Sequence, residues 1–187
     1  MKSLSEMNLE ELWRLFPIFL TDHKSCWKDW YLIEENLLKN TLSSNVKINH
    51  IGSTAIDAIW AKPIIDILVE IPFGDDILSY VNGIESIGYI CMSNSSTRLS
   101  FNKGYTVDGF AEKVFHVHLR YAGDNDELYF RDYLNDNSDI AHEYENLKLK
   151  LWKEFEYNRD AYTHAKTDFV KMYTTKAKSL YGDRYIF

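Results

Sequence analysis

Apolar side chains recur along this chain with two different spacings, which separate predicted helices from predicted strands. A spacing of three to four residues predicts helices over residues 8–20, 27–42, 75–87, 126–136, 139–156 and 160–180. Alternation and short apolar runs predict strands over residues 46–51, 63–71, 89–93, 97–103 and 112–121. Because the strands precede the last three helices, the pattern favours an α+β fold in which a helical tail folds back on one sheet.

An acidic residue interrupts the most hydrophobic of these strands. Successive side chains of a strand point to opposite sides, so Asp66 lies on the face opposite Ile65 and Ile67. A buried carboxylate is costly unless it is paired, hydrogen-bonded or bound to a metal ion. Asp66 is therefore either a structural residue satisfied by backbone amides or an arginine, or a ligand of a functional site.

Two other strands also have one apolar and one polar face. His116 and His118 share a face of the strand 112–121, where two imidazoles can hold a metal ion or an anion. The alternative is that both are surface histidines of a half-exposed sheet. The polar face of the strand 97–103 is formed by Arg98, Ser100 and Asn102. Together the strands predict a sheet with helices on one face and a polar concavity on the other.

Length and composition are those of a globular protein with one domain. The 187 residues, of which 45% are hydrophobic, fit one domain, with an α/β core over about 1–125 and C-terminal helices over about 126–187. No apolar run reaches the roughly 18 residues of a membrane span, and the first residues lack the apolar segment of a signal peptide. We therefore expect a cytoplasmic protein without membrane contact.

Charge is unevenly distributed along the chain. The net charge of −7 argues against a general nucleic-acid-binding surface. Residues 146–187, however, hold 9 Lys and Arg against 5 Asp and Glu. Within them Arg159, Tyr162 and Lys166 follow each other at i, i+3 and i+7, which places them on one stripe of a helix. The basic tail predicts either packing against the acidic body or a local anion site.

The most specific stretch is residues 50–71, in which a strand ends in Gly52, Ser53 and Thr54 and a helical connection leads to the strand of Asp66. A glycine lets the backbone approach a ligand closely. Ser53 and Thr54 can cap the following helix, whose amides and dipole favour a phosphate. Asp66 can hold a divalent cation beside that phosphate. The ordered set is more specific than any of its parts.

This stretch resembles the Gly-Ser signature of the nucleotidyltransferase superfamily and, more closely, the GrpB family. The matching positions are His50-Ile51-Gly52-Ser53-Thr54-Ala55, Lys62-Pro63, Ile65-Asp66-Ile67-Leu68-Val69, Arg98 and Lys103, His116-Val117-His118, Phe130-Arg131-Asp132-Tyr133-Leu134, Tyr144 with Leu147 and Lys148, and Tyr162 with Lys166. They lie between about Trp27 and about Tyr173. The resemblance implies a single GrpB-like domain over 1–187 with a nucleotidyltransferase-like mixed sheet, helices on one face and a C-terminal helical region.

One position departs from the superfamily pattern, which places a second carboxylate two residues after the aspartate. This chain has Leu68 there, so Asp66 lacks the partner used in two-metal sites. Glu70 lies on the same face but about 7 Å further along the strand, which makes it a poor substitute. His116 and His118 would, with Asp66, suit a transition metal better than Mg²⁺. Alternatively, the histidines bind phosphate and no metal is present.

Two functional hypotheses follow. The first is an enzyme that transfers a nucleotidyl or phosphoryl group from a nucleoside triphosphate, held with Mg²⁺, Mn²⁺ or Zn²⁺, to an unknown acceptor. The second, favoured by Leu68, is a non-catalytic module that binds a nucleotide or another phosphorylated small molecule. The expected catalytic and metal-binding residues are Asp66, His116 and His118. The expected nucleotide- or phosphate-binding residues are Gly52, Ser53, Thr54, Arg98, Arg131, Tyr162 and Lys166.

Overall fold

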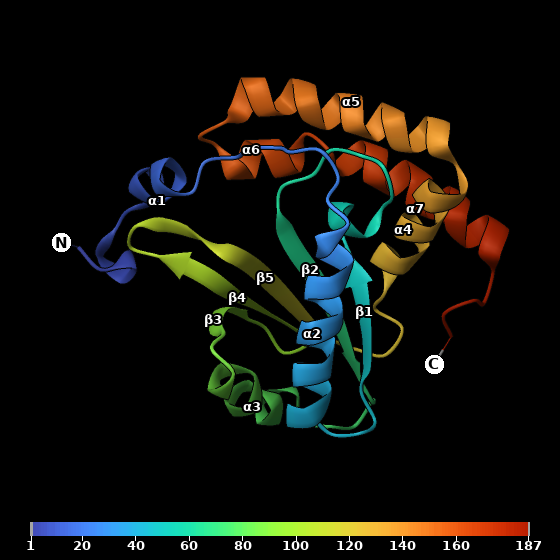
Figure 1. Cartoon of the computed structure of the whole chain (residues 1–187). Coiled ribbons are helices and arrows are strands. Elements are labelled where there is room, and N and C mark those ends of the chain that lie inside the picture. Colours follow the sequence, from blue (N-terminus) through green and yellow to red (C-terminus); the bar gives the residue numbers. More distant parts are fainter. Residues whose placement is uncertain (1, 187) are drawn as a thin grey trace.

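A five-stranded mixed sheet organises the protein, whose computed structural model describes residues 2–186. The strand order is β1-β2-β5-β4-β3 (Figure 1). The strands are β1 (Lys47–Ile51), β2 (Ile64–Ile71), β3 (Ile90–Asn94), β4 (Arg98–Thr106) and β5 (Gly109–Tyr121). β2 and β5 run parallel, whereas the other neighbouring pairs are antiparallel. The α+β class and the mixed sheet are thus confirmed.

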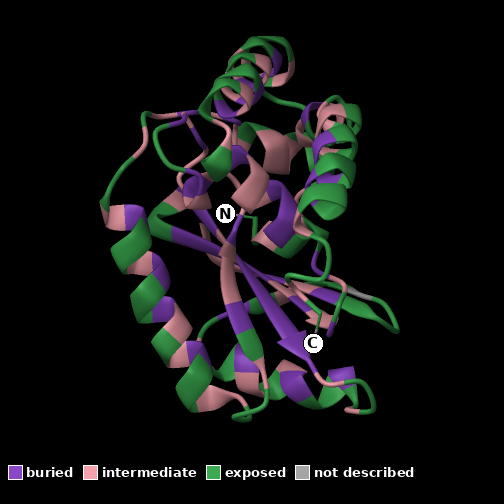
Figure 2. Cartoon of the chain, turned by 90° about the vertical axis from the view of Figure 1, so that its right-hand side faces the viewer, coloured by how far each residue is buried: buried purple, intermediate pink, exposed green. Residues whose placement is uncertain are grey.

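The apolar face of the sheet packs against helices from the first half of the chain. α2 (Cys26–Thr41) crosses this face, and η3 (Ile77–Tyr80) with α3 (Val81–Ser86) covers its lower end (Figure 1). The common core includes Ile65, Ile67, Phe115 and Val117 of the sheet and Trp27, Leu38 and Ile84 of the helices. Figure 2 shows buried residues along the strands and exposed residues on the outer sides of the helices. Strand alternation predicts this face as the core.

Three predicted helices differ from the structure. The helix predicted over 75–87 consists of the 3-10 helix η3 and the short α-helix α3. α1 (Leu9–Leu15) ends at Leu15 rather than at residue 20, because Pro17 disfavours a helical conformation in the residue before it. The helix predicted over 160–180 divides into α6 (Arg159–His164) and α7 (Thr167–Tyr181).

The C-terminal helices form a layer beyond one end of the sheet. α4 (Asp126–Asp136), α5 (Ser138–Phe155), α6 and α7 lie together there (Figure 1). Their core, which also includes two residues from the connection before β2, contains Ile56, Ile59, Phe130, Leu134, Tyr144 and Tyr173. Within residues 2–186, no helix has both the length and the apolar character that a membrane crossing requires.

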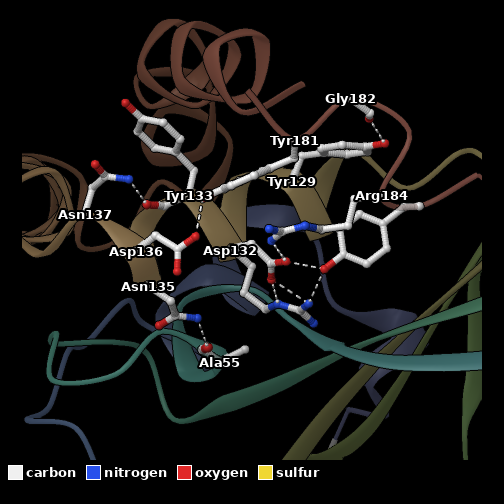
Figure 3. A network of polar contacts seen from close by, with 12 residues as sticks. Ala55, Tyr129, Asp132, Tyr133, Asn135, Asp136, Asn137, Tyr181, Gly182 and Arg184 are labelled. Atoms are coloured by element: carbon white, nitrogen blue, oxygen red, sulfur yellow. Dashed lines mark hydrogen bonds and ion pairs between the residues drawn. The ribbon is translucent and has the colours of Figure 1, made fainter. Parts of the chain in front are cut away.

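Polar contacts tie the end of the chain back to α4 (Figure 3). The Tyr129 hydroxyl donates to the carbonyl oxygen of Gly182 at 2.9 Å. Arg184 forms an ion pair with Asp132 at 2.9 Å, and the Tyr181 hydroxyl bonds to a further carboxylate of α4. These contacts hold α4 and the end of α7 together, and α4 borders the site described next.

Candidate functional site

A carboxylate and two imidazoles meet on the polar face of the sheet. The parallel pairing of β2 with β5 places Asp66 beside His116, and two residues further on it places His118 beside Leu68. His116 Nδ1 lies 3.1 Å from Asp66 Oδ1, and His118 Nε2 lies 3.3 Å from the same oxygen. One ligand atom from each residue lies within 4.8 Å of the other two. We call Asp66, His116 and His118 the Asp–His cluster.

Gly52 is required where the chain turns away from β1 beside this cluster. Its φ of +73° is rare for residues with a side chain. A Cβ atom at this position would lie 2.5 Å from Asp66 Oδ2. The glycine therefore lets the turn pass directly against the carboxylate. The following helix, η2 (Ser53–Ala55), has only three residues, so the helical connection expected after Ser53 is a single short turn.

Hydrogen bonds fix the tautomer of His116. Its Nε2 lies 2.8 Å from the Tyr105 hydroxyl, which itself accepts a hydrogen bond from Arg159 at 3.3 Å. The ionised Asp66 carboxylate can only accept, so His116 Nδ1 carries the ring proton and donates it, and Nε2 of the neutral ring accepts from the Tyr105 hydroxyl.

The protonation states of the cluster suit cation binding. Burial lowers the pKa of the His116 ring, although Asp66 opposes the effect. Burial also acts to raise the pKa of the Asp66 carboxyl, but hydrogen bonds from His116 and His118 outweigh it and hold that pKa well below its usual value. The result is an ionised carboxylate beside a neutral imidazole, and a cation would replace the ring protons that now point at Asp66.

The Asp–His cluster forms one side of a cleft of about 320 Å³. Gly52 and Ser53 border the cleft at the end of β1. Other parts of its lining come from the loop before β2 and from the C-terminal helices. Its basic and aromatic side chains include Lys62, Lys148, Arg159, Tyr162 and Lys166.

Three lysines of the cleft gather around aromatic rings, and we call Lys62, Lys148 and Lys166 the lysine cluster. The ammonium groups of Lys62 and Lys166 lie 5.2 and 4.4 Å from the ring centre of the buried Tyr162. Lys148 is 1% exposed and donates to the carbonyl oxygen of Trp60. Within residues 2–186, no carboxylate lies in ion-pair distance of any of the three ammonium groups.

This arrangement lowers the affinity of the lysines for their protons. Burial lowers the pKa of Lys62 to about 7, and the charges of Lys166 and Arg159 add to the effect. Burial likewise lowers the pKa of Lys148 to about 7, with Lys166 again contributing. Positive charge without a protein partner is characteristic of a site that an anion completes.

Eight of the ten predicted site residues line this cleft: Gly52, Ser53, Asp66, His116, His118, Arg131, Tyr162 and Lys166. Thr54 does not, because it is buried and its hydroxyl donates to the carbonyl oxygen of Ile64 at 3.2 Å. Arg98 does not either, since it pairs with Asp124 through two contacts of 2.6 Å at an exposed position. The structure therefore does not bring these two predicted residues together with the other eight.

Arg131 borders the cleft, but protein groups already occupy its guanidinium. It donates to the carbonyl oxygen of His50 at 2.7 Å and to the Tyr185 hydroxyl at 3.0 Å. It also pairs with Asp132 at 2.7 Å. Arg131 therefore positions the end of β1, where the Gly52 turn begins.

The two side chains that follow Asp66 on its face are structural. Leu68 is fully buried against Ile51 and Leu128. Glu70 is 2% exposed and accepts hydrogen bonds from the Gly123 amide and the Asn125 side chain at 3.1 and 2.8 Å. Glu70 is thus separate from the cleft, as its distance along the strand predicts.

The sequence pattern leaves the roles of Lys62 and Lys148 open and gives no indication of Tyr105. For Lys148 a signal existed, because the buried residues of α5 recur at helical spacing: Ala141, Tyr144, Lys148 and Leu151. A lysine on the apolar stripe of an amphipathic helix is unusual. The role of Tyr105 depends on its contact with His116, which no spacing in the sequence indicates.

Comparisons with known proteins agree with this geometry. A family model described as GrpB protein matches residues 17–176. The glutamate-rich protein GrpB of Alkalihalophilus pseudofirmus is 35% identical over 160 residues, covering 82% of this chain and 91% of the relative. A crystal structure of the conserved protein GrpB from Enterococcus faecalis is 32% identical with a TM-score of 0.74, covering 87% of this chain and 99% of that chain.

The fold is also shared at much lower sequence identity. The Cid1 poly(U) polymerase with Mg 3′-dATP bound is 10% identical with a TM-score of 0.52, covering 84% of this chain and 51% of that chain. This likeness concerns the fold alone, and it confirms the nucleotidyltransferase-like architecture. Since the family model spans most of the sequence and is supported by relatives above 30% identity, the chain belongs to the GrpB family.

Proposed function

We propose that the cleft binds a divalent metal–nucleoside triphosphate and that the protein transfers a nucleotidyl or phosphoryl group from it to a small molecule. The observation that carries the proposal is that the lysine cluster and the Asp–His cluster line the same cleft. A metal–triphosphate supplies both missing partners, because its cation matches the carboxylate and its phosphates match the lysines. The net charge of −7 supports a small acceptor rather than a nucleic acid.

The donor atoms fit a divalent ion. One carboxylate oxygen and two imidazole nitrogens suit Mn²⁺ or Zn²⁺ better than Mg²⁺, which prefers oxygen ligands. An ion held by Asp66, His116 and His118 would stabilise negative charge on the phosphate oxygens as a Lewis acid.

Other residues of the cleft act on the phosphates directly. Lys62, Lys148 and Lys166 neutralise their charge, and Ser53 offers a hydroxyl at the turn that Gly52 makes possible. The Cid1 structure with bound Mg 3′-dATP supports a nucleotide ligand by fold-level analogy.

Leu68 favours a second candidate function, a nucleotide- or anion-binding module without turnover. The leucine is fully buried, so no second carboxylate completes a two-metal site next to Asp66. The two candidate functions share the ligand and differ only in whether a group is transferred.

Calorimetry with Mn²⁺, and then with a non-hydrolysable ATP analogue, tests the shared ligand. Asp66→Asn should weaken Mn²⁺ binding by about tenfold or more, since it removes the charged ligand. Lys166→Met should weaken binding of the analogue by roughly 10- to 150-fold, which corresponds to the 1.5–3 kcal/mol of a hydrogen bond to a charged group. Arg98→Met is the matched control, because it removes a cation outside the cleft. Equal effects of Lys166→Met and Arg98→Met contradict the proposal.

Turnover separates the two candidate functions. Radiolabelled triphosphates are incubated with the protein, Mn²⁺ and a small-molecule extract. Label in a new product with wild-type protein, and its absence with Asp66→Asn, supports a transferase. Label that remains on the triphosphate, despite measured binding, supports the module.

A further inference from the structure

A second cavity, of about 890 Å³, opens beside the Asp–His cluster, and we call it the apolar groove. One wall is formed by Leu9, Leu12 and Trp13 at α1, and another by Ile90 and Met92 of β3. The groove and the lysine-lined cleft share three lining residues: His116, His118 and Arg159. The two cavities therefore meet at the Asp–His cluster.

The walls of the groove carry apolar surface that the protein leaves uncovered. No residue of α1 is buried, and Leu9 is 62% exposed. On the opposite wall Ile90 and Met92 are 56% and 59% exposed. Contiguous apolar surface of this kind is characteristic of binding sites.

The charged groups of the groove do not favour a phosphate. Lys103 forms an ion pair with the buried Glu34 at 2.7 Å. Arg159 donates to the Tyr105 hydroxyl, and Asp160 adds a negative charge. The groove thus fits an uncharged molecule, in contrast to the cleft with its three lysines.

We propose that the apolar groove binds the acceptor, an uncharged molecule with a compact apolar body and a hydroxyl group directed at the Asp–His cluster. This inference rests on the proposed function. In phosphoryl and nucleotidyl transfer the attacking and leaving oxygens lie roughly in line on opposite sides of the phosphorus. The lysine cluster holds the leaving phosphates on one side of the Asp–His cluster, so the nucleophile enters from the groove.

The transfer step requires only the acceptor, the triphosphate and water. The acceptor oxygen forms a bond to the attacked phosphorus, and the bond from that phosphorus to the bridging oxygen on the lysine side breaks. The electron pair of the broken bond remains on the leaving phosphate, next to the lysine cluster. The hydroxyl proton passes to water.

The groove is tested first without metal or triphosphate, using naphthylethanol as a neutral alcohol and naphthylacetate as its matched anion. Fluorinated tryptophan gives one fluorine NMR signal for each of the five tryptophans, and Trp13→Phe assigns the signal of Trp13. We expect the alcohol to shift this signal saturably and the anion to bind about tenfold more weakly. Met92→Glu should weaken binding of the alcohol by about tenfold or more. Ile33→Glu, at a similarly exposed position of α2 (63%), should leave it unchanged.

Three results overturn the proposal. The first is a Trp13 signal that the alcohol leaves unmoved. The second is equal weakening by Met92→Glu and Ile33→Glu. The third is a Trp13 signal that shifts with protein concentration alone, which would mean that a second copy of the chain fills the groove.

Orientation is tested with Mn²⁺ bound. The paramagnetic ion should shorten the relaxation times of the CH₂OH protons of naphthylethanol more than those of its distal ring. A reversed or absent gradient with Mn²⁺ bound overturns the acceptor role. Failure of Mn²⁺ itself to bind overturns the proposed metal site instead, while the Trp13 experiment still decides whether the groove binds the alcohol.

Discussion

Replacing Gly52 by alanine should remove metal binding at a limited cost in stability. The new Cβ atom would lie 2.5 Å from Asp66 Oδ2, so the carboxylate must leave its place beside His116 and His118. The backbone at φ +73° and ψ −174° costs a residue with a side chain about 1–3 kcal/mol. In a chain of this length each kcal/mol lowers Tm by about 2–4 °C. We therefore expect a folded protein with a lower Tm and an incomplete Asp–His cluster.

Gly74→Ala is the matched control for this prediction. Gly74 has a φ of +101°, and a Cβ atom there would meet nothing within 4 Å. Both variants thus carry a strained backbone, but only Gly52→Ala displaces Asp66. Calorimetry should show Mn²⁺ affinity reduced by about tenfold or more in Gly52→Ala and unchanged in Gly74→Ala. Wild-type Mn²⁺ affinity in a destabilised Gly52→Ala protein would refute the reasoning.

Three further predictions concern buried ionisable groups. Glu70→Ala should lower the free energy of unfolding by about 1–3 kcal/mol or more, because the Gly123 amide and the Asn125 side chain lose the carboxylate that accepts from them. Urea unfolding measures this loss. Calorimetry should show that the Mn²⁺ affinity of the variant is unchanged. The difference in the free energy of unfolding between wild type and Lys148→Met should become more favourable to wild type as the pH rises from about 7 to 10, as measured by urea unfolding. The reason is that Lys148 loses its proton near pH 7 in the folded protein but keeps it to about pH 10.4 in the unfolded chain. A free-energy difference that does not change with pH would contradict the lowered pKa of Lys148. Triphosphate binding just above pH 7 should be accompanied by proton uptake, because the phosphates raise the pKa values of Lys62 and Lys148 from about 7. Calorimetry in buffers of different ionisation enthalpy measures this uptake. Binding heats that are the same in all buffers would contradict it.

For the candidate residues on strands, alternation predicted the face of the sheet, but it did not predict which strands are neighbours. Asp66, His116 and His118 share the polar face, as a period of two requires. That β2 pairs with β5, and that Asp66 stands opposite His116, joins residues 50 positions apart. No local pattern in the sequence predicts this pairing, which could be expected only from the resemblance to a known fold.

Alternation also did not predict how far along its strand each residue lies from the site. In β4 it is Asn102 that pairs with His116, whereas Arg98 pairs with Arg120. Four residues of strand correspond to about 13 Å, which places Arg98 far from Asp66. The convergence of the lysines has a similar origin, since Lys148 reaches the cleft by packing α5 against a loop 88 positions earlier in the chain.

The lysine cluster bears on how a site with a single carboxylate could work. Elsewhere in residues 2–186 buried carboxylates have partners, as Glu34 has Lys103, whereas Lys148 has a carbonyl oxygen and the ring of Tyr144 but no carboxylate. Replacing such a residue by an apolar one of similar size commonly stabilises a protein, so its presence is best explained by an anionic ligand. An acidic residue in place of Leu68 would be buried against Ile51 and Leu128, so one substitution cannot restore a two-metal site. We infer that the positive charge a second ion provides in such sites is provided here by the three lysines.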